Sequence, residues 1–217
     1  MGAAAYRYGV VFLVVLIAVV FTIVAPEGDG SRAASFALLG TVLLVVIDTS
    51  RERTAVRRRR ASIGAAVILI VTAGIAVGVV PRGTALLLSA LLTLATPVTL
   101  VGGLLRLVRE HGVTLQAVAG ALAIYLLVGF AFASLIGFVA DVGSGNYYAQ
   151  GTNGTESEHV YYSFTVLTTT GFGDFTAAHG AGRALAVIEM LTGQLYLVTV
   201  IGILIGRRVG EAPGSAR

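Results

Sequence analysis

The sequence predicts an all-α integral membrane protein with six transmembrane helices and, between the fifth and the sixth, a short re-entrant helix followed by a loop. The 217 residues are 56% hydrophobic and 12% charged, which leaves too few charges to cover a water-soluble globule. Six apolar stretches approach the roughly 20 residues that a helix needs to cross a bilayer. A further apolar stretch is too short to cross and leads into a glycine-containing loop.

The six predicted transmembrane helices are separated by gaps that hold most of the charged residues. They cover residues 8–25, 32–48, 61–80, 84–105, 113–140 and 181–206. The second is the shortest, and we expect its flanking arginines to snorkel toward the headgroups. The first has Arg7 before an apolar run, as a signal peptide does, but its length and the Pro26 that follows Ala25 argue against cleavage.

Arginine placement orients the chain. With alternate gaps on opposite sides, 12 of the 15 basic residues share the side of both termini, and only Arg32, Arg82 and Arg183 lie on the other. Because basic residues accumulate in cytoplasmic loops, we predict a multi-pass protein of the cell membrane with both termini cytoplasmic. The external side then holds a set of acidic residues that attract cations: Glu27, Asp29, Asp141, Glu156, Glu158 and Asp174.

Composition narrows the function classes. The formal net charge of +4 follows from the arginine-rich gaps, so it does not indicate a nucleic-acid partner. The chain has no cysteine, which excludes disulfides, thiolate nucleophiles and cysteine metal sites. A membrane enzyme is disfavoured because the sequence shows no catalytic pair, metal-ligand cluster or phosphate-binding loop. We therefore predict neither enzymatic activity nor an organic cofactor.

The short apolar stretch begins with Thr155-Glu156-Ser157-Glu158, which has the form of a capping box. It predicts a helix over residues 156–168. About a dozen residues at about 1.5 Å each reach only about 18 Å, so this helix enters the membrane without crossing it. The preceding residues 141–154 are rich in glycine, serine, asparagine and tyrosine and are predicted to form an exposed loop.

The residues after this helix favour binding of a dehydrated cation. Non-helical backbone at membrane depth must be buried in protein or line water, and here it reads Thr169-Thr170-Gly171-Phe172-Gly173-Asp174. Gly171 and Gly173 adopt positive φ at little cost, which lets successive carbonyl oxygens point the same way. Rings of these oxygens from four copies would replace a hydration shell, with the Thr169 hydroxyl as an inner layer. The negative end of the short helix adds to this preference.

Residues 161–174 resemble the pore region of potassium channels, whose filter loops read Thr-Val-Gly-Tyr-Gly. The resemblance continues through Gly182-Arg183 and residues 189–196, and more weakly back through 113–115 and 124–127, so it covers about the last hundred residues. It is a resemblance to prokaryotic single-pore potassium channels with six spans and one pore loop. It implies a homotetramer that conducts K⁺ passively, with K⁺ bound by a filter that also contains Gly173: Thr169, Thr170, Gly171 and Phe172.

The resemblance divides the chain at about residue 110. Residues 1–110 would form a peripheral domain of four membrane helices. Residues 111–217 would form a pore domain with an outer helix at 113–140, a pore helix at 156–168, a filter at 169–174 and an inner helix at 181–206. The peripheral part resembles a voltage sensor, but residues 84–105 contain no charge and Arg106 and Arg109 only follow them. Steep voltage gating needs several charges inside the field, so we predict weak or no voltage dependence.

Three residues depart from the family pattern: Thr170 stands where Val is usual, Phe172 where Tyr is usual, and Ala177 where Pro is usual. Phe172 lacks a hydroxyl that braces the filter, and the Thr170 hydroxyl needs a partner. A poorly selective monovalent cation channel is therefore the nearest alternative. A potassium transporter subunit is a second, but such subunits usually string four pore loops in one chain, and this chain has one.

Four residues are expected to support the filter. The resemblance implies that Asp174 accepts a hydrogen bond from Tyr161, with a solvated surface Asp174 as the alternative. Tyr162 lies on the same short helix. Glu189 is a carboxyl inside an apolar helix, where such groups are paired or functional. We expect it to bond behind the filter, near Thr165 or Tyr162, as a structural brace or a proton sensor.

The remaining candidates each have a plain structural alternative. Gly193 lies where inner helices of the family hinge, and close helix packing is the alternative. His159 and His179 are expected to be ordinary exposed histidines near the outer mouth. A basic cluster either binds anionic lipid headgroups or only orients the chain: Arg57, Arg58, Arg59 and Arg60.

Overall fold

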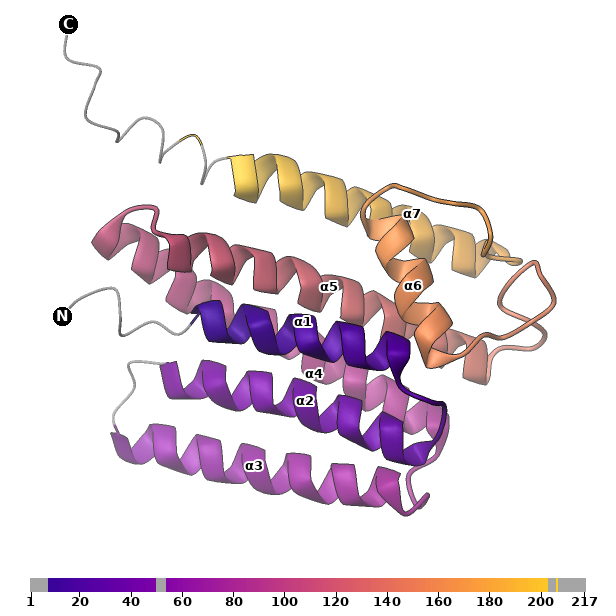
Figure 1. Cartoon of the computed structure of the whole chain (residues 1–217), viewed down its shortest axis with the longest axis horizontal. Coiled ribbons are helices and arrows are strands. Elements are labelled where there is room, and N and C mark those ends of the chain that lie inside the picture. The colour runs from indigo at the N-terminus through magenta and orange to yellow at the C-terminus, as the bar shows by residue number, and fades with distance from the viewer. Residues whose placement is uncertain (1–7, 50–53, 203–205, 207–217) are drawn as a thin grey trace, which may run out of the picture.

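The computed structural model describes residues 8–49, 54–202 and 206, and this part of the chain is a bundle of long helices (Figure 1). In chain order the helices are α1 (Tyr8–Val24), α2 (Asp29–Thr49), α3 (Thr54–Ala76), α4 (Arg82–His111), α5 (Leu115–Val142), α6 (Glu156–Leu167) and α7 (Gly180–Tyr196), with a π-helical turn, η2, at Leu197–Ile201. Among the described residues the β-structure is limited to an isolated bridge between Tyr148 and Ala177. The predicted all-α class is confirmed.

Five helical segments are long and apolar enough to cross a membrane: Asp29–Ile47, Arg58–Ala76, Arg82–His111, Leu115–Val142 and Gly180–Val200. The first predicted span corresponds to α1, which is apolar but has 17 residues. At about 1.5 Å per residue it reaches about 26 Å, a little less than the roughly 30 Å of a hydrocarbon core. The sixth span therefore stays a prediction, while a helical membrane protein is supported.

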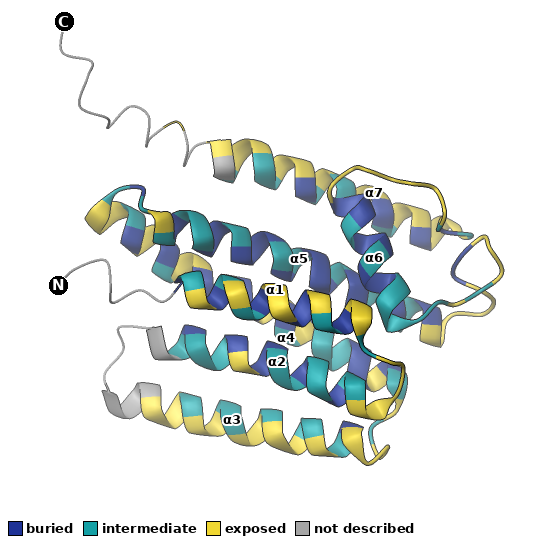
Figure 2. Cartoon of the chain, in the orientation of Figure 1, coloured by how far each residue is buried: buried dark blue, intermediate teal, exposed yellow. Residues whose placement is uncertain are grey.

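The helices are stacked so that α5 lies at the centre of the packing. α3 packs against α2, α2 packs against α1 and α4, and both α1 and α4 pack against α5. One hydrophobic cluster joins these helices to α6, with a buried side chain from each of α1, α2, α4, α5 and α6: Val11, Leu39, Leu104, Leu127 and Val160. Figure 2 shows α5 largely buried, whereas α3 and α7 carry many exposed positions. Helices α1, α2 and α4 thus share a core with the last hundred residues, and α3 packs on the outside of α2.

The two ends of the bundle differ in charge. At one end lie the ends of α2, α4 and α7 and the starts of α1, α3 and α5 (Figure 1). The described arginines of this end are Arg57, of which only the backbone is described, Arg58, Arg59, Arg60, Arg106 and Arg109, and those of the opposite end are Arg32, Arg82 and Arg183. Arg7, Arg51, Arg53, Arg207, Arg208 and Arg217 lie outside the described residues. This division matches the predicted one, and the cytoplasmic assignment stays a prediction.

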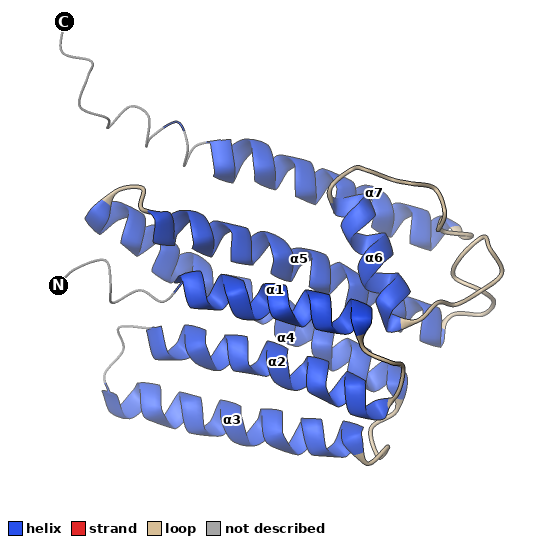
Figure 3. Cartoon of the chain, in the orientation of Figure 1, coloured by secondary structure: helices blue, strands red, loops and turns tan. Residues whose placement is uncertain are grey.

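The short helix α6 starts where the capping box predicts. The Glu158 amide donates to Thr155 Oγ1 at 3.1 Å, and the Thr155 amide donates to Glu158 Oε2 at 2.8 Å. The capping box is confirmed, and it satisfies two amides at the helix start. α6 packs against α1, α5 and α7, and long loops precede and follow it at the same end of the bundle (Figure 3). Residues 168–179 therefore form a loop beside α7 that joins it to α6.

Candidate functional site

The backbone after α6 turns its amides toward the helix end. The Thr170 and Gly171 amides both donate to the carbonyl oxygen of Thr165, at 2.9 and 3.0 Å, and the Thr169 amide donates to Val166 at 2.9 Å. In a trans peptide the C=O points opposite to the N–H of the same unit. The carbonyl oxygens of Thr169 and Thr170 therefore point away from α6, and both do so from one side of the segment.

Backbone dihedral angles alternate along the same segment. Thr169, Gly171 and Gly173 have φ values of 58°, 52° and 83°, whereas the intervening Thr170 and Phe172 have negative φ. The predicted positive φ of the two glycines is confirmed. Thr169 is the one non-glycine residue with positive φ among those described, a conformation that costs an L residue about 1–2 kcal/mol. Strain held at a single threonine beside the glycines is typical of a functional segment.

The hydroxyls of all three threonines at residues 168–170 have protein partners. The Thr168 hydroxyl donates to the Phe164 carbonyl at 2.7 Å, so it accepts from the Thr170 hydroxyl at 2.9 Å. The partner that Thr170 needs is therefore Thr168. The Thr169 hydroxyl donates to the Thr168 carbonyl at 2.7 Å and accepts from Gln194 Nε2 at 2.8 Å. Our sequence candidates omitted Gln194, although an amide inside an apolar helix beside Gly193 was an available signal.

This segment lies on the outside of the single chain. Residues 168–174 are all exposed, and the Phe172 side chain keeps 69% of its surface accessible. A row of exposed apolar side chains follows on α7 and η2: Val187, Ile188, Leu191, Leu195 and Val198. One chain thus presents the carbonyl-bearing segment without enclosing it.

Tyr161, Phe172 and Asp174 lie together at the outer end of the segment. The Tyr161 ring stacks on the Phe172 ring, with centroids 6.3 Å apart and planes 6° apart. Hydrogen bonding to Asp174 is the largest cause of a raised pKa at Tyr161, followed by desolvation and by the charge of Asp174. The structure therefore brings together the two residues of the predicted Tyr161–Asp174 pair and adds Phe172 to them.

An aromatic cluster backs the segment. Tyr162 is buried and meets the Tyr148 and Tyr147 rings edge to face at 5.2 and 6.4 Å, and Phe175 meets Tyr148 at 5.1 Å. The prediction of an exposed loop over residues 141–154 is wrong at two positions, because Tyr147 and Tyr148 keep only 4% and 1% of their surface exposed. The large rings of this glycine-rich loop pack against apolar side chains beneath it, which the composition of the loop does not predict.

Glu189 is fully buried behind α6, and its partner is Ser163. Glu189 Oε1 lies 2.5 Å from the Ser163 hydroxyl, which is also 2.7 Å from the Gly129 carbonyl of α5. Glu189 thus bonds to a residue next to Tyr162, near the expected place, but neither Thr165 nor Tyr162 is its hydrogen-bond partner. Tyr162, Ser163 and Thr165 lie within one turn of α6, and the sequence alone does not fix which of them faces α7.

The Ser163 hydroxyl lies between two oxygens, Glu189 Oε1 and the Gly129 carbonyl. A hydroxyl has one hydrogen, and a backbone carbonyl only accepts. Both contacts are satisfied when Ser163 donates to Gly129 and its oxygen accepts from a protonated Glu189, whereas with an ionised Glu189 the single hydrogen goes to Oε1. The second carboxyl oxygen, Oε2, has no protein partner, which also fits a neutral acid better than a buried carboxylate. The geometry fits a brace between α5, α6 and α7.

Gly193 lies against the end of α6. A Cβ added there would collide with the carbonyl oxygen of Leu167 and would lie 3.1 Å from a Leu167 methyl carbon. The same carbonyl accepts the Tyr125 hydroxyl of α5 at 3.2 Å. The close approach of α7 to α6 favours the packing interpretation of Gly193. The hinge stays a prediction, although the π-helical turn follows at Leu197–Ile201.

The two candidate histidines, His159 and His179, differ in exposure. His179 is exposed, as expected, but His159 has 1% of its surface exposed, so the expectation of an exposed residue is wrong there. Its Nδ1 pairs with the Tyr148 hydroxyl at 3.0 Å, and the rings stack. Burial, and then the charge of Arg82, lower the pKa of His159 to about 3. His159 is therefore a neutral packing residue of α6.

The arginine cluster of α3 is solvent-accessible where it is described. Arg58, Arg59 and Arg60 are exposed at the start of that helix, while the side chain of Arg57 lies outside the described part. This placement serves either predicted role of the cluster.

A protein-family model described as "Ion channel" matches residues 120–207. The match covers most of α5, all of α6 and α7, and the loops between them. It supports an ion channel and points to a transport protein rather than an enzyme. No curated protein and no solved structure matches the chain.

The His159 environment predicts acid sensitivity. A histidine whose folded pKa lies below its unfolded value of about 6.5 leaves the unfolded chain with more bound protons, so its stabilisation is complete above about pH 6.5 and is lost toward about pH 3. The midpoint of thermal unfolding of the purified protein should fall between about pH 7 and about pH 4. His159→Gln should reduce that fall, and an equal fall in both proteins would contradict the assignment.

A protonated Glu189 predicts that Glu189→Gln is tolerated, because an amide N–H can replace the acid O–H toward Ser163. Glu189→Ala removes the bond and leaves a cavity, so it should cost about 3 kcal/mol. Thermal unfolding measures both. The infrared C=O band of a protonated carboxylic acid should be present in the wild type and absent in Glu189→Gln. If Gln destabilises as much as Ala, an ionised carboxylate is required instead.

Close packing at Gly193 predicts that Gly193→Ala destabilises the protein by about 1–3 kcal/mol through forced separation of α6 and α7. Gly202→Ala is the matched control, because Gly202 is helical and has open space around it. Thermal unfolding of the two variants provides the comparison. Equal stability would show that the collision relaxes at no cost and would leave the hinge interpretation favoured.

Proposed function

We propose that this chain is one subunit of a homotetrameric, potassium-selective channel that conducts K⁺ passively. One observation carries the proposal: consecutive amides of the segment after α6 bond to the single carbonyl of Thr165, while φ alternates in sign at residues 169–173. Together these features turn successive carbonyl oxygens to the side away from α6. Such a row of oxygens is the ligand set that replaces the hydration shell of K⁺.

Four copies of the row are needed to surround an ion, and closed cyclic symmetry is the usual way to arrange them. The exposure of residues 168–174 and of the apolar face of α7 supports this assembly. In the tetramer K⁺ would be held by oxygens of Thr169, Thr170, Gly171 and Phe172, with Gly173 completing the filter. The C-terminal end of α6 would direct its negative partial charge toward the inner entrance.

Selectivity for K⁺ over a poorly selective cation pore is favoured by the bracing of the segment. The hydroxyl of Thr170 is bonded to Thr168, and the ring of Phe172 stacks on Tyr161. Both departures from the usual filter sequence thus have a partner on α6 or next to it. The transporter alternative is disfavoured because the chain provides one such segment.

The first four helices act as a packed peripheral domain in this proposal. α4 carries no charged residue between Arg82 and Arg106, so little charge moves through the membrane field. We infer weak or absent voltage dependence, cytoplasmic termini, and contact of the exposed arginines at the start of α3 with anionic headgroups.

Recording from the purified protein in a planar bilayer tests the proposal. With K⁺ on one side and Na⁺ on the other, the current should reverse far on the potassium-selective side of zero. Gly173→Ala should abolish the current because an L side chain is strained at a φ of 83°, and Gly202→Ala should retain it. Reversal near zero would instead support the poorly selective pore, and absence of current in the wild type would reject a channel.

A further inference from the structure

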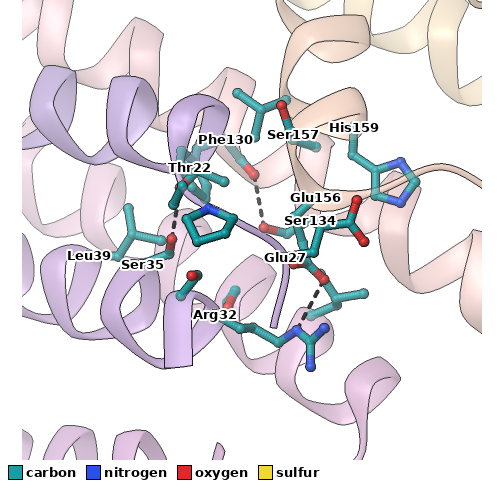
Figure 4. A pocket seen from close by; sticks show the side chains of 17 residues that line it. Thr22, Glu27, Arg32, Ser35, Leu39, Phe130, Ser134, Glu156, Ser157 and His159 are labelled. Atoms are coloured by element: carbon teal, nitrogen blue, oxygen red, sulfur yellow. Dashed lines mark hydrogen bonds and ion pairs between the residues drawn. The ribbon is translucent and has the colours of Figure 1, made fainter. Parts of the chain in front are cut away.

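The first turn of α6 is attached to three of the four N-terminal helices. Glu156 Oε1 lies 3.0 Å from Arg32 Nε of α2 and 3.3 Å from Arg82 Nε at the start of α4. Beside it, the Ser157 hydroxyl donates to the Ile23 carbonyl of α1 at 2.9 Å. Figure 4 shows Arg32 reaching the carboxylate of Glu156 across the gap between their helices. The two arginines and Glu156 form what we call the Arg32–Glu156–Arg82 triad.

The triad is partly shielded, and its Arg82–Glu156 contact is an ion pair in which Arg82 Nε lacks hydrogen-bond geometry. The side chains of Arg32, Glu156 and Arg82 keep 16%, 19% and 37% of their surface exposed, so screening by salt is weaker than for surface pairs. Arg32 Nη1 also bonds to Asp29 at 2.6 Å, and Arg82 Nη2 donates to the Gly154 carbonyl at 3.2 Å. Among the described arginines, two of the three outside the basic end of the bundle therefore contact the start of α6 or the loop before it.

Apolar packing does not fill this region. A cavity of about 50 Å³ lies between α1, α2, α4, α5 and α6, with room for a few water molecules. Its lining includes Arg32 and Glu156 and a set of hydroxyl side chains: Thr22, Ser35, Ser89, Ser134 and Ser157 (Figure 4). The position of the α6 N-terminus relative to α2 and α4 therefore depends on directional polar contacts more than on interlocking side chains.

The other end of α6 carries the filter. The Thr165 carbonyl accepts the amides of Thr170 and Gly171, and Gly193 lies directly on the last turn. α6 has 12 residues, so about 18 Å of rigid helix separates the triad from the filter amides. A shift or tilt at the first turn must displace the last turn, and the last turn orients the filter carbonyls.

We propose that Arg32 and Arg82 are positioning residues that set the filter geometry through Glu156, so that α2 and α4 control the pore from its external end. This inference rests on the proposed channel function for its consequence, but its geometric part concerns α6 alone. Loss of either arginine leaves Glu156 under-neutralised, and loss of Glu156 leaves two neighbouring guanidinium groups without their shared partner. Each change should loosen the filter segment without removing a filter residue.

Hydrogen–deuterium exchange of the full-length protein in lipid nanodiscs, followed by mass spectrometry, measures that loosening. Arg32→Gln, Arg82→Gln and Glu156→Gln should each speed exchange of the peptide spanning residues 165–174 by about tenfold, the factor expected for one lost charge-assisted hydrogen bond. Arg106→Gln is the matched control, since Arg106 is an exposed arginine at the far end of α4. Arg82→Lys keeps the charge near Glu156 and should restore most of the protection.

Rubidium uptake into liposomes by the same variants links the geometry to conduction. Uptake should fall in the three triad variants, remain in Arg106→Gln and recover in Arg82→Lys. Unchanged filter exchange in all three triad variants would overturn the inference, as would faster exchange spread equally over α3, which would mark general destabilisation. If the wild type passes no rubidium, the channel proposal fails, and the exchange data still decide whether the triad positions the filter segment.

Discussion

Backbone polar groups that leave a helix at membrane depth must be paired, because water is not there to satisfy them. In the proposed re-entrant arrangement, the segment after α6 meets this requirement on one side only: its amides bond to the carbonyls of Thr165 and Val166. The carbonyl oxygens of the same peptide units then point to the outside of the chain. Everything proposed about ion conduction depends on this division, since it leaves the carbonyl oxygens of Thr169 and Thr170 without a hydrogen bond to any described residue, whereas the Thr168 carbonyl accepts the Thr169 hydroxyl.

Contacts with α5, α6 and α7 hold the segment in this orientation. Glu189 and Ser163 join α7 to α6 and, through Gly129, to α5. Gln194 reaches the Thr169 hydroxyl at the inner end of the segment, and Tyr161 stacks on Phe172 at the outer end. The bonds of Ser163 to Glu189 and Gly129 are buried, where a polar group without a partner is costly, whereas the Gln194–Thr169 bond and the Phe172 ring are exposed. The segment is thus braced along its whole length from behind.

Local features were predictable from the sequence because they depend on neighbours in the chain. The capping box at Thr155 and Glu158 and the positive φ of Gly171 and Gly173 follow from side-chain chemistry within a few residues. The long helices follow from the length and apolarity of the stretches. α1 shows the limit of predicting a membrane span from apolarity, because it is apolar but has only 17 residues.

Contacts between distant residues were not predictable in the same way. The burial of His159 and Tyr148 depends on where a loop folds back, and the choice of Ser163 over Thr165 as the partner of Glu189 depends on the rotation of α6. Arg32 and Arg82 stood out in the sequence as exceptions to the arginine bias. Their shared partner, Glu156, emerged only from the packing of α2, α4 and α6.

The most direct test of this account is a crystal structure of the protein grown with thallium, a K⁺ analogue that scatters anomalously. The account predicts anomalous peaks on a four-fold axis, each surrounded by carbonyl oxygens of residues 169–172 from four chains. Carbonyls turned toward α6, or peaks absent from the axis beside this segment, would contradict it.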